Sequence, residues 1–204
     1  MPDDELFIDP AGPNPLPHDP FKAIVAPRPI GWISTLGSEG RPNLAPYSFF
    51  NGICTSPRLV MFCSEGFKDS VRNASETREF VCNLATRTLA AQMNESSRTV
   101  PSTTNEFELA GLEVAPCRIV KPARVAASPA ALECRVVDVI RLKDADGRAL
   151  DNWMTIGQVV GMRVRRDCLR DGLFDMTLAG TIARCGYRGD YLEATELFEM
   201  LRPS

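Results

Sequence analysis

The sequence predicts a mainly β fold, an antiparallel barrel with only short peripheral helices. Apolar segments rich in β-branched and aromatic residues recur along the 204 residues, with turn residues between them. The connections are too short or too polar to supply the crossover helices that a parallel sheet needs. No glycine motif of a phosphate-binding loop or a dinucleotide-binding fold is present.

The composition is that of a globular protein with one domain of ordinary size. The chain is 44% hydrophobic and 24% charged, with a net charge of -3. This balance gives no reason to expect nucleic acid or an anionic membrane as a partner. No apolar run approaches the roughly 20 residues that span a bilayer. Because the first residues are acidic and precede no apolar segment, no secretion signal is expected, and the predicted location is cytoplasmic.

Metal and disulfide chemistry are not expected. The seven cysteines are odd in number and none form a C-x-x-C pair, which indicates reduced thiols. The single histidine, His18, lies among prolines, so a histidine-ligated metal or a histidine-based triad is not expected. No side chain is predicted to act as the catalytic group.

The chain is expected to begin with an irregular, proline-rich arm over residues 1–20, followed by one domain over residues 21–204. Gly37 and Gly40 bound a turn between the first two strands. The expected strands are one beginning at Ile30 and others at residues 43–53, 58–63, 79–85, 131–142 and 154–164.

Two short helices are expected. Asp69 can cap the first, whose inner face would use Val71 and Ala74, with the stem of Arg78. The second contains Leu89, Ala90 and Met93. The Ser/Thr-rich segment 94–106 follows as a loop, and loops of this length inside a domain are usually functional or mobile.

Polar residues on the second strand and at the following helix suggest a binding site. Lys68, Asp69 and Ser70 place a cation and a hydroxyl at a helix N-terminus, where free N–H groups and the helix dipole favour a phosphate. An ordinary aspartate cap beside a solvated lysine is the alternative, and from these three residues alone it is the commoner case. The hypothesis that accounts for both features is a binding site for a flat, phosphorylated ligand.

The order of motifs resembles the flavin reductase-like family, whose fold is the Greek-key, FMN-binding split β-barrel. The resemblance covers about residues 20 to 203. It is carried by R-P-I-G-W-I-S-T at 28–35, N-L-A-P-Y-S-F-F-N at 43–51, K-D-S at 68–70 with Asn73, E-F-V-C-N at 79–83, E-F-E-L-A-G-L at 106–112, S-P-A-A-L-E-C at 128–134, G-Q-V-V-G at 157–161, A-R-C-G-Y at 183–187, Tyr191 and F-E-M-L-R-P at 198–203.

The resemblance implies a homodimer that binds FMN, takes hydride from NADH or NADPH, and serves a monooxygenase or another electron-transfer partner. A flavoredoxin-type electron carrier without nicotinamide activity is the alternative. The residues implied in FMN binding are Asn43, Ala45, Pro46, Tyr47, Ser48, Ser64, Lys68 and Ser70.

Two arginines each have two alternative roles at this point. Arg28 precedes the first strand and is suited either to the phosphate or to a dimer contact. Arg163 stands where the family often has a histidine, and it would either pair with the 2′-phosphate of NADPH or lie solvated on a strand.

Overall fold

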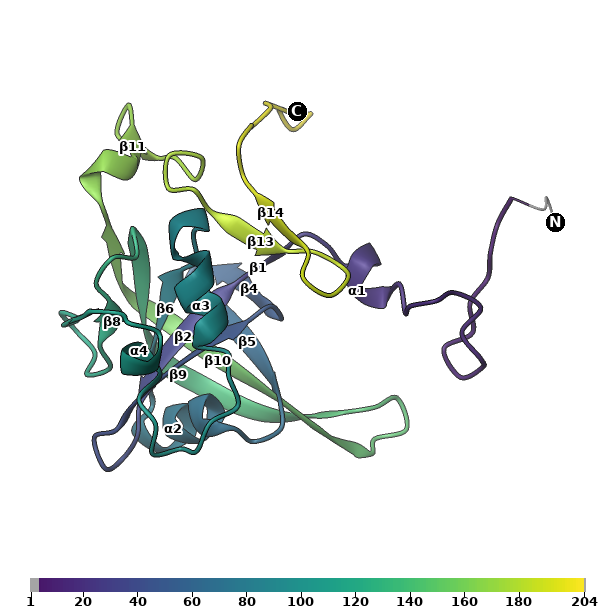
Figure 1. The fold of residues 1–204 in the computed structure, drawn as a ribbon, viewed down its shortest axis with the longest axis horizontal. Coiled ribbons are helices and arrows are strands. Elements are labelled where there is room, and N and C mark those ends of the chain that lie inside the picture. Colours follow the sequence, from purple (N-terminus) through teal and green to yellow (C-terminus); the bar gives the residue numbers. More distant parts are fainter. Residues whose placement is uncertain (1–3, 204) are drawn as a thin grey trace.

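A seven-stranded antiparallel sheet forms the centre of the computed structural model, which describes residues 4–203 (Figure 1). The strands lie in the order β3-β2-β6-β9-β10-β5-β4. Their bounds are β2 Gly31–Leu36, β3 Pro42–Tyr47, β4 Phe50–Thr55, β5 Arg58–Glu65, β6 Glu79–Leu84, β9 Ala130–Lys143 and β10 Ala149–Val164. The mainly β, antiparallel prediction is therefore confirmed.

Shorter elements surround this sheet. The small strands are β1 Arg28–Pro29, β7 Val114–Ala115, β8 Arg124–Val125, β11 Leu169–Arg170, β12 Leu173–Phe174, β13 Ile182–Arg184 and β14 Tyr191–Glu193. The helices are α1 Phe21–Ile24, α2 Asp69–Thr77, η1 Arg87–Leu89, α3 Ala90–Glu95, α4 Glu106–Leu109 and η2 Arg166–Cys168. The prediction missed α4, which begins at the end of the expected loop.

The prediction of one strand over residues 43–53 is wrong. The segment divides into β3, which pairs with β2, and β4, which pairs with β5, so its halves lie at opposite ends of the strand order. Because only Ser48 and Phe49 connect them, the sheet must curl until its two edges approach each other. The Tyr47 and Phe62 rings meet across this split, with centroids 4.9 Å apart.

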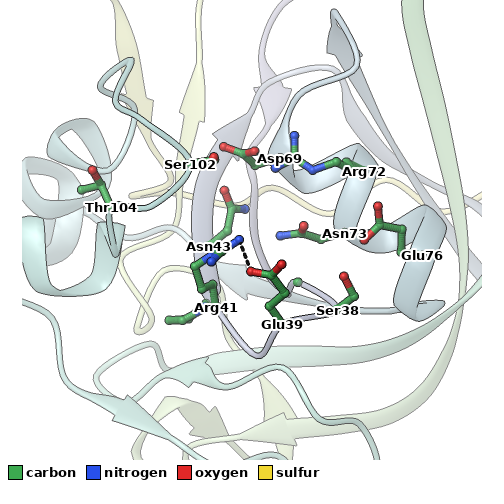
Figure 2. A pocket seen from close by; sticks show the side chains of 12 residues that line it. Ser38, Glu39, Arg41, Asn43, Asp69, Arg72, Asn73, Glu76, Ser102 and Thr104 are labelled. Atoms are coloured by element: carbon green, nitrogen blue, oxygen red, sulfur yellow. Dashed lines mark hydrogen bonds and ion pairs between the residues drawn. The ribbon is translucent and has the colours of Figure 1, made fainter.

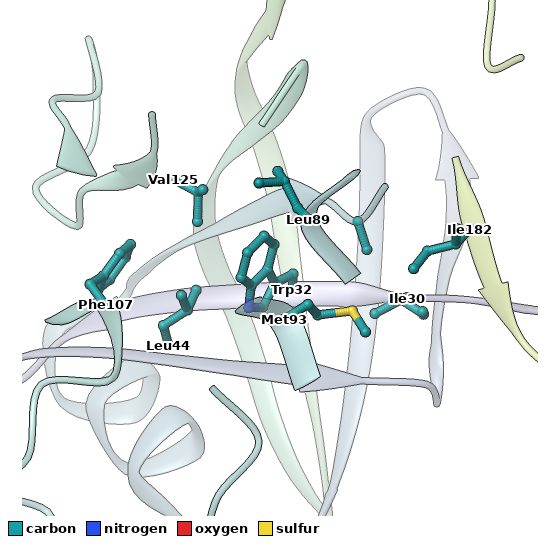
Figure 3. Packing of buried hydrophobic residues seen from close by; sticks show 9 residues of the cluster. Ile30, Trp32, Leu44, Leu89, Met93, Phe107, Val125 and Ile182 are labelled. Atoms are coloured by element: carbon teal, nitrogen blue, oxygen red, sulfur yellow. The ribbon is translucent and has the colours of Figure 1, made fainter. Parts of the chain in front are cut away.

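Two apolar clusters pack on the two faces of the curled sheet. One contains Phe62 and Phe80 from the strands, with Val71 and Ala74 of α2 packed against them. The other surrounds the fully buried Trp32 and holds α3 and α4 against the sheet through Met93 and Phe107 (Figure 3). The expected inner face of the first helix is thus confirmed for Val71 and Ala74, whereas the expectation that the Arg78 stem joins it is wrong, because Arg78 lies beyond the helix and is exposed.

Helix α2 begins differently from the expectation. Lys68 occupies the N-cap position and Asp69 is the first helical residue, without a side-chain cap. Arg78 lies just beyond the helix, with a φ of 62°. Its guanidinium donates to the carbonyls of Val136 and Val137, so this arginine joins the helix end to β9.

Residues 4–20 form no helix or strand, and Figure 1 shows them leading away from the sheet. Residues 1–3 and 204 lie outside the described part, so the division into an arm and one domain stays a prediction. Between residues 4 and 203 no helix has the length and apolar character needed to cross a bilayer.

Candidate functional site

Strand β3 is an edge strand whose outward groups are available to a ligand. The Leu44 N–H points away from β2 and donates to Glu106 Oε2 at 3.2 Å. Since N–H and C=O groups alternate in direction along an antiparallel strand, Pro46 faces the same way, where its missing N–H costs no ladder bond. The carbonyls of Leu44 and Pro46 are therefore directed outward.

A cavity of about 290 Å³ lies at this edge. It is enclosed by β3, the N-terminus of α2 and the segment between α3 and α4. The lining residues are Asn43, Ala45, Pro46, Tyr47, Lys68, Asp69, Ser70, Ser96, Ser97, Arg98, Thr99, Val100 and Glu106. Asn43, Ala45, Pro46, Tyr47, Lys68 and Ser70, all predicted from the sequence, thus meet in one place. We refer to this space as the β3 cavity.

Buried hydrogen bonds hold the tip of α2 against β3. Asn43 Nδ2 donates to Ser70 Oγ at 2.9 Å and to Thr35 Oγ1 at 3.0 Å, and Asn73 Nδ2 donates to the same Thr35 oxygen at 3.1 Å. All four side chains are buried. The α2 N-terminus is thereby fixed at the rim of the β3 cavity.

This helix tip suits an anion. The first N–H groups of a helix have no acceptor within the helix and carry the positive end of its dipole. The exposed Lys68 adds a cation beside them. The Asp69 carboxylate forms an ion pair with Arg72, which offsets its negative charge at this position.

Tyr47 provides a protonated hydroxyl between the strand and the helix tip. Burial raises the pKa of Tyr47, while the neighbouring hydroxyls of Ser70 and Ser64 lower it only in part. Ser64 is 1% exposed and donates to the Gly66 carbonyl at 2.9 Å. Ser64 therefore lies behind Tyr47 and supports it, and it does not line the cavity.

Ser48 and Arg28 lie apart from the β3 cavity. Both line a separate groove near Phe49 and Phe50. The Arg28 guanidinium donates to the carbonyls of Lys22, Val25 and Cys185, which ties α1 and the C-terminal strands to β1. In this arrangement Arg28 does not face the α2 tip.

The sequence reasoning missed the residues that form the far wall. Ser96 Oγ accepts from the Trp32 indole at 2.9 Å and donates to the Met93 carbonyl at 2.8 Å, which anchors the segment 96–100. The polar character of the loop was the only signal for it. Helix α4 had a clearer one, because Asn105 caps the Phe107 N–H and Glu108 stands three residues after it.

Glu106 is the buried acid of the site. It is 6% exposed, and this burial raises the pKa of its carboxyl, while bonds from the Glu106 and Leu44 N–H groups oppose the shift. The charge of Asp69 adds to the increase. Glu106 thus shields the β3 edge from one side and presents a carboxyl to the cavity from the other.

The remaining candidates lie elsewhere. Arg163 is exposed on β10, opposite Ala131 of β9. The His18 ring lies 6.0 Å from the Tyr187 ring, and both residues are exposed. Over residues 4–203 no group of His, Cys, Asp and Glu side chains is arranged to hold a metal ion.

Comparison with known proteins identifies the fold and the family. Residues 25–178 match the flavin reductase like domain. A Deinococcus radiodurans protein of no assigned function is 37% identical over 192 residues, which cover 88% of this chain and 82% of that protein.

Two solved structures are similar over most of the chain. Nitrilotriacetate monooxygenase component B from Bacillus cereus superposes with a TM-score of 0.86 at 27% identity, over 96% of this chain and 98% of that chain. A Shewanella frigidimarina protein assigned as a flavin reductase with a split-barrel domain has a TM-score of 0.80 at 19% identity, over 90% of each chain. The predicted Greek-key split barrel is confirmed.

Proposed function

The chain belongs to the flavin reductase-like domain family, and we propose that it is an FMN-binding oxidoreductase that accepts electrons from NADH or NADPH. Family membership supports a flavin-related oxidoreductase role. The observation that carries the rest is the β3 cavity, where an open strand edge meets an anion-binding helix tip.

The residues present fit the two ends of FMN, the ring and the phosphate. The outward carbonyls of Leu44 and Pro46 are acceptors for the polar edge of the ring, and Tyr47 offers a hydroxyl. At the other end, Lys68, Ser70 and the free N–H groups of α2 form a cationic donor set for the phosphate. Arg98 lines the same cavity and adds a second cation.

The protein's part in the reaction is binding and orientation. Bound FMN would supply the redox chemistry, taking hydride from a nicotinamide and passing electrons onward. Glu106 fixes the edge of β3 through Leu44, and the Asn43–Ser70 bond fixes the helix tip relative to it. Because burial raises the pKa of Tyr47, its hydroxyl remains protonated and would donate a hydrogen bond to the bound flavin. Such a division of labour needs no catalytic acid or base from the chain.

The proposal also covers the electron acceptor, the nicotinamide donor and the location of the protein. The similarity to a monooxygenase component B supports an oxygenase as the electron acceptor. Arg163 is exposed and remains our candidate for recognising the 2′-phosphate of NADPH. All seven cysteines are free thiols, which supports a cytoplasmic location.

We also propose a homodimer. The N-terminal arm and the C-terminal tail both present large apolar side chains to solvent, with Phe7 88% and Phe198 85% exposed. Large apolar side chains exposed along a segment in this way commonly mark an interaction surface. Light scattering at micromolar concentration is expected to give twice the mass of the chain.

Anaerobic reduction tests the proposed reaction. The purified protein is loaded with FMN and mixed with NADH or NADPH while the flavin absorption is followed. Rapid bleaching by either donor, compared with free FMN at the same concentration, is the expected result. Reduction only through a partner protein would favour the flavoredoxin-type carrier. A folded protein that takes up no FMN would contradict the flavin assignment itself.

A further inference from the structure

In the described part of the chain, one carboxyl group of the β3 cavity has no cation paired with it. Two acidic residues, Asp69 and Glu106, line the cavity. Asp69 forms an ion pair with Arg72, and Figure 2, which looks into the neighbouring cavity beside the β2–β3 turn, shows both side chains on α2. Glu106 is 6% exposed and forms no ion pair within residues 4–203. Its charge therefore acts on whatever occupies the β3 cavity.

The two cations that line the β3 cavity have other partners. Arg98 forms an ion pair with Glu95 at 2.9 Å. Lys68 is exposed at the α2 tip, where we propose that it binds the phosphate. Water and salt screen exposed charges such as these far more than they screen a buried charge. Neither cation therefore cancels the charge of Glu106 inside the cavity.

Hydrogen bonds stabilise the charged form of Glu106, and its charge reaches Tyr47. Burial raises the pKa of the Glu106 carboxyl, but hydrogen bonds from the Glu106 and Leu44 N–H groups favour the carboxylate. Burial also raises the pKa of Tyr47, and the charges of Asp69 and Glu106 raise it further. A second negative charge is therefore disfavoured in this part of the β3 cavity.

Reduction places a negative charge on the flavin ring. A hydride brings two electrons and one proton, so the neutral ring of oxidised FMN becomes an anion while the nicotinamide donor becomes a cation. The negative charge of the reduced ring lies on its polar edge, at N1 and O2. In the function proposed above, the Leu44 carbonyl accepts from that edge, and the Leu44 N–H, which points the same way, donates to Glu106. The carboxylate and the charge of the reduced ring would therefore lie on the same side of β3.

We propose that the Glu106 carboxylate makes the β3 cavity bind oxidised FMN more tightly than reduced FMN. The inference rests on the proposed flavin function. Repulsion between two negative charges raises the free energy of the complex with reduced FMN, whereas the neutral oxidised ring is not repelled. Reduced FMN then leaves the site for its acceptor, and oxidised FMN takes its place. Glu106 thus determines which redox form of the flavin the protein retains.

The ratio of two affinities tests this proposal. Calorimetric titration with FMN, and with dithionite-reduced FMN under anaerobic conditions, measures both at about pH 8, where glutamates are ionised. Glu106→Gln removes the charge and keeps an oxygen that accepts from Leu44, so the preference for oxidised FMN should shrink by about tenfold. The midpoint potential of bound FMN should rise by about 30 mV, the equivalent of tenfold for two electrons. Glu108→Gln, exposed on the same helix and outside the cavity, is the control and should leave the preference unchanged.

The outcomes separate this inference from the flavin function. An equal change in both affinities in Glu106→Gln would overturn the inference and leave FMN binding intact, because Glu106 would then only hold the β3 edge. Glu106→Asp keeps the charge, so it should retain the preference for oxidised FMN even where both affinities fall, and loss of the preference in this variant would also overturn the inference. A wild-type protein that binds neither form of FMN would overturn the flavin function together with it.

Discussion

The two edges of the seven-stranded sheet come from neighbouring residues and differ in almost every respect. At β3, Asn43 and Leu44 are buried, and α3, α4 and the segment 96–100 cover the strand. At β4, every residue from Asn51 to Thr55 is exposed. An open strand edge therefore becomes a specific site only when other segments enclose it.

The enclosing contacts are few and specific. Glu106 accepts the outward Leu44 N–H, Ser70 accepts from Asn43, and Trp32 holds Ser96. Strand β4 has no comparable partner for its outward groups in the described structure. An unpaired edge of this kind is a template for another chain, which agrees with the proposed dimer.

The two edges are expected to differ most in how far a truncated side chain lowers the free energy of unfolding. Phe62 is fully buried and contacts Tyr47 and Phe80, whereas Ile53 on β4 is 47% exposed. Phe62→Ala is expected to lower the free energy of unfolding by about 3–5 kcal/mol, because it leaves a cavity where the edges meet. Ile53→Ala is expected to cost about 0.5 kcal/mol or less. Urea unfolding of both variants measures the contrast, and equal losses would show that the split does not depend on this aromatic contact.

The next effect is on flavin binding. Replacing Lys68 and Ser70 together with alanine removes a cation and a hydroxyl from the α2 tip. FMN affinity is expected to fall by about 2–4 kcal/mol, from charge-assisted hydrogen bonds of 1.5–3 kcal/mol each. Fluorescence titration measures it.

The matched control for this variant lies at the exposed β4 edge. Thr55→Ala with Arg58→Ala removes a hydroxyl and a cation from the exposed β4–β5 turn. This pair is expected to leave FMN affinity unchanged. Should the α2 variant bind FMN as tightly as the control, the phosphate does not lie at the helix tip.

The sequence predicted the strand at the β3 edge but did not predict β4 as a separate strand, for a physical reason. Periodicity and β-branched residues locate strands, and the position of Lys68–Ser70 at a helix N-terminus, where we propose the phosphate binds, follows from local helix chemistry. The division of residues 43–53 has no local signal, because both halves are extended and apolar. It follows from long-range pairing, β3 with β2 and β4 with β5.

The same limit explains the site residues. Asn43 to Tyr47 lie on one strand, so a motif places them together. Ser48 comes after the strand ends and lines another groove, and Ser64 lies behind Tyr47, because side-chain direction depends on where each strand stops. Glu106 was not selected, since a single acid in a polar loop gives no sign of its burial against Leu44.

The smallest expected effect is the pH dependence of stability that arises from Glu106, which covers the β3 edge. Burial raises the pKa of Glu106, so its carboxyl holds a proton more tightly in the folded state than in the unfolded chain. Its contribution to stability is therefore fully present at low pH and is lost as the pH rises through the raised pKa. Glu106→Gln removes this loss and keeps an oxygen that accepts from Leu44, so its stability relative to the wild type should increase as the pH rises above about 4, the ordinary pKa of a glutamate. Because the amide preserves the hydrogen bond, the two proteins should differ by less than about 1 kcal/mol at low pH. Urea unfolding across this pH range, with the exposed Glu108→Gln on the same helix as control, measures the trend. If both variants follow the same pH profile, the Glu106 carboxyl does not titrate as a buried group, and the β3 edge is more open to water than its contacts indicate.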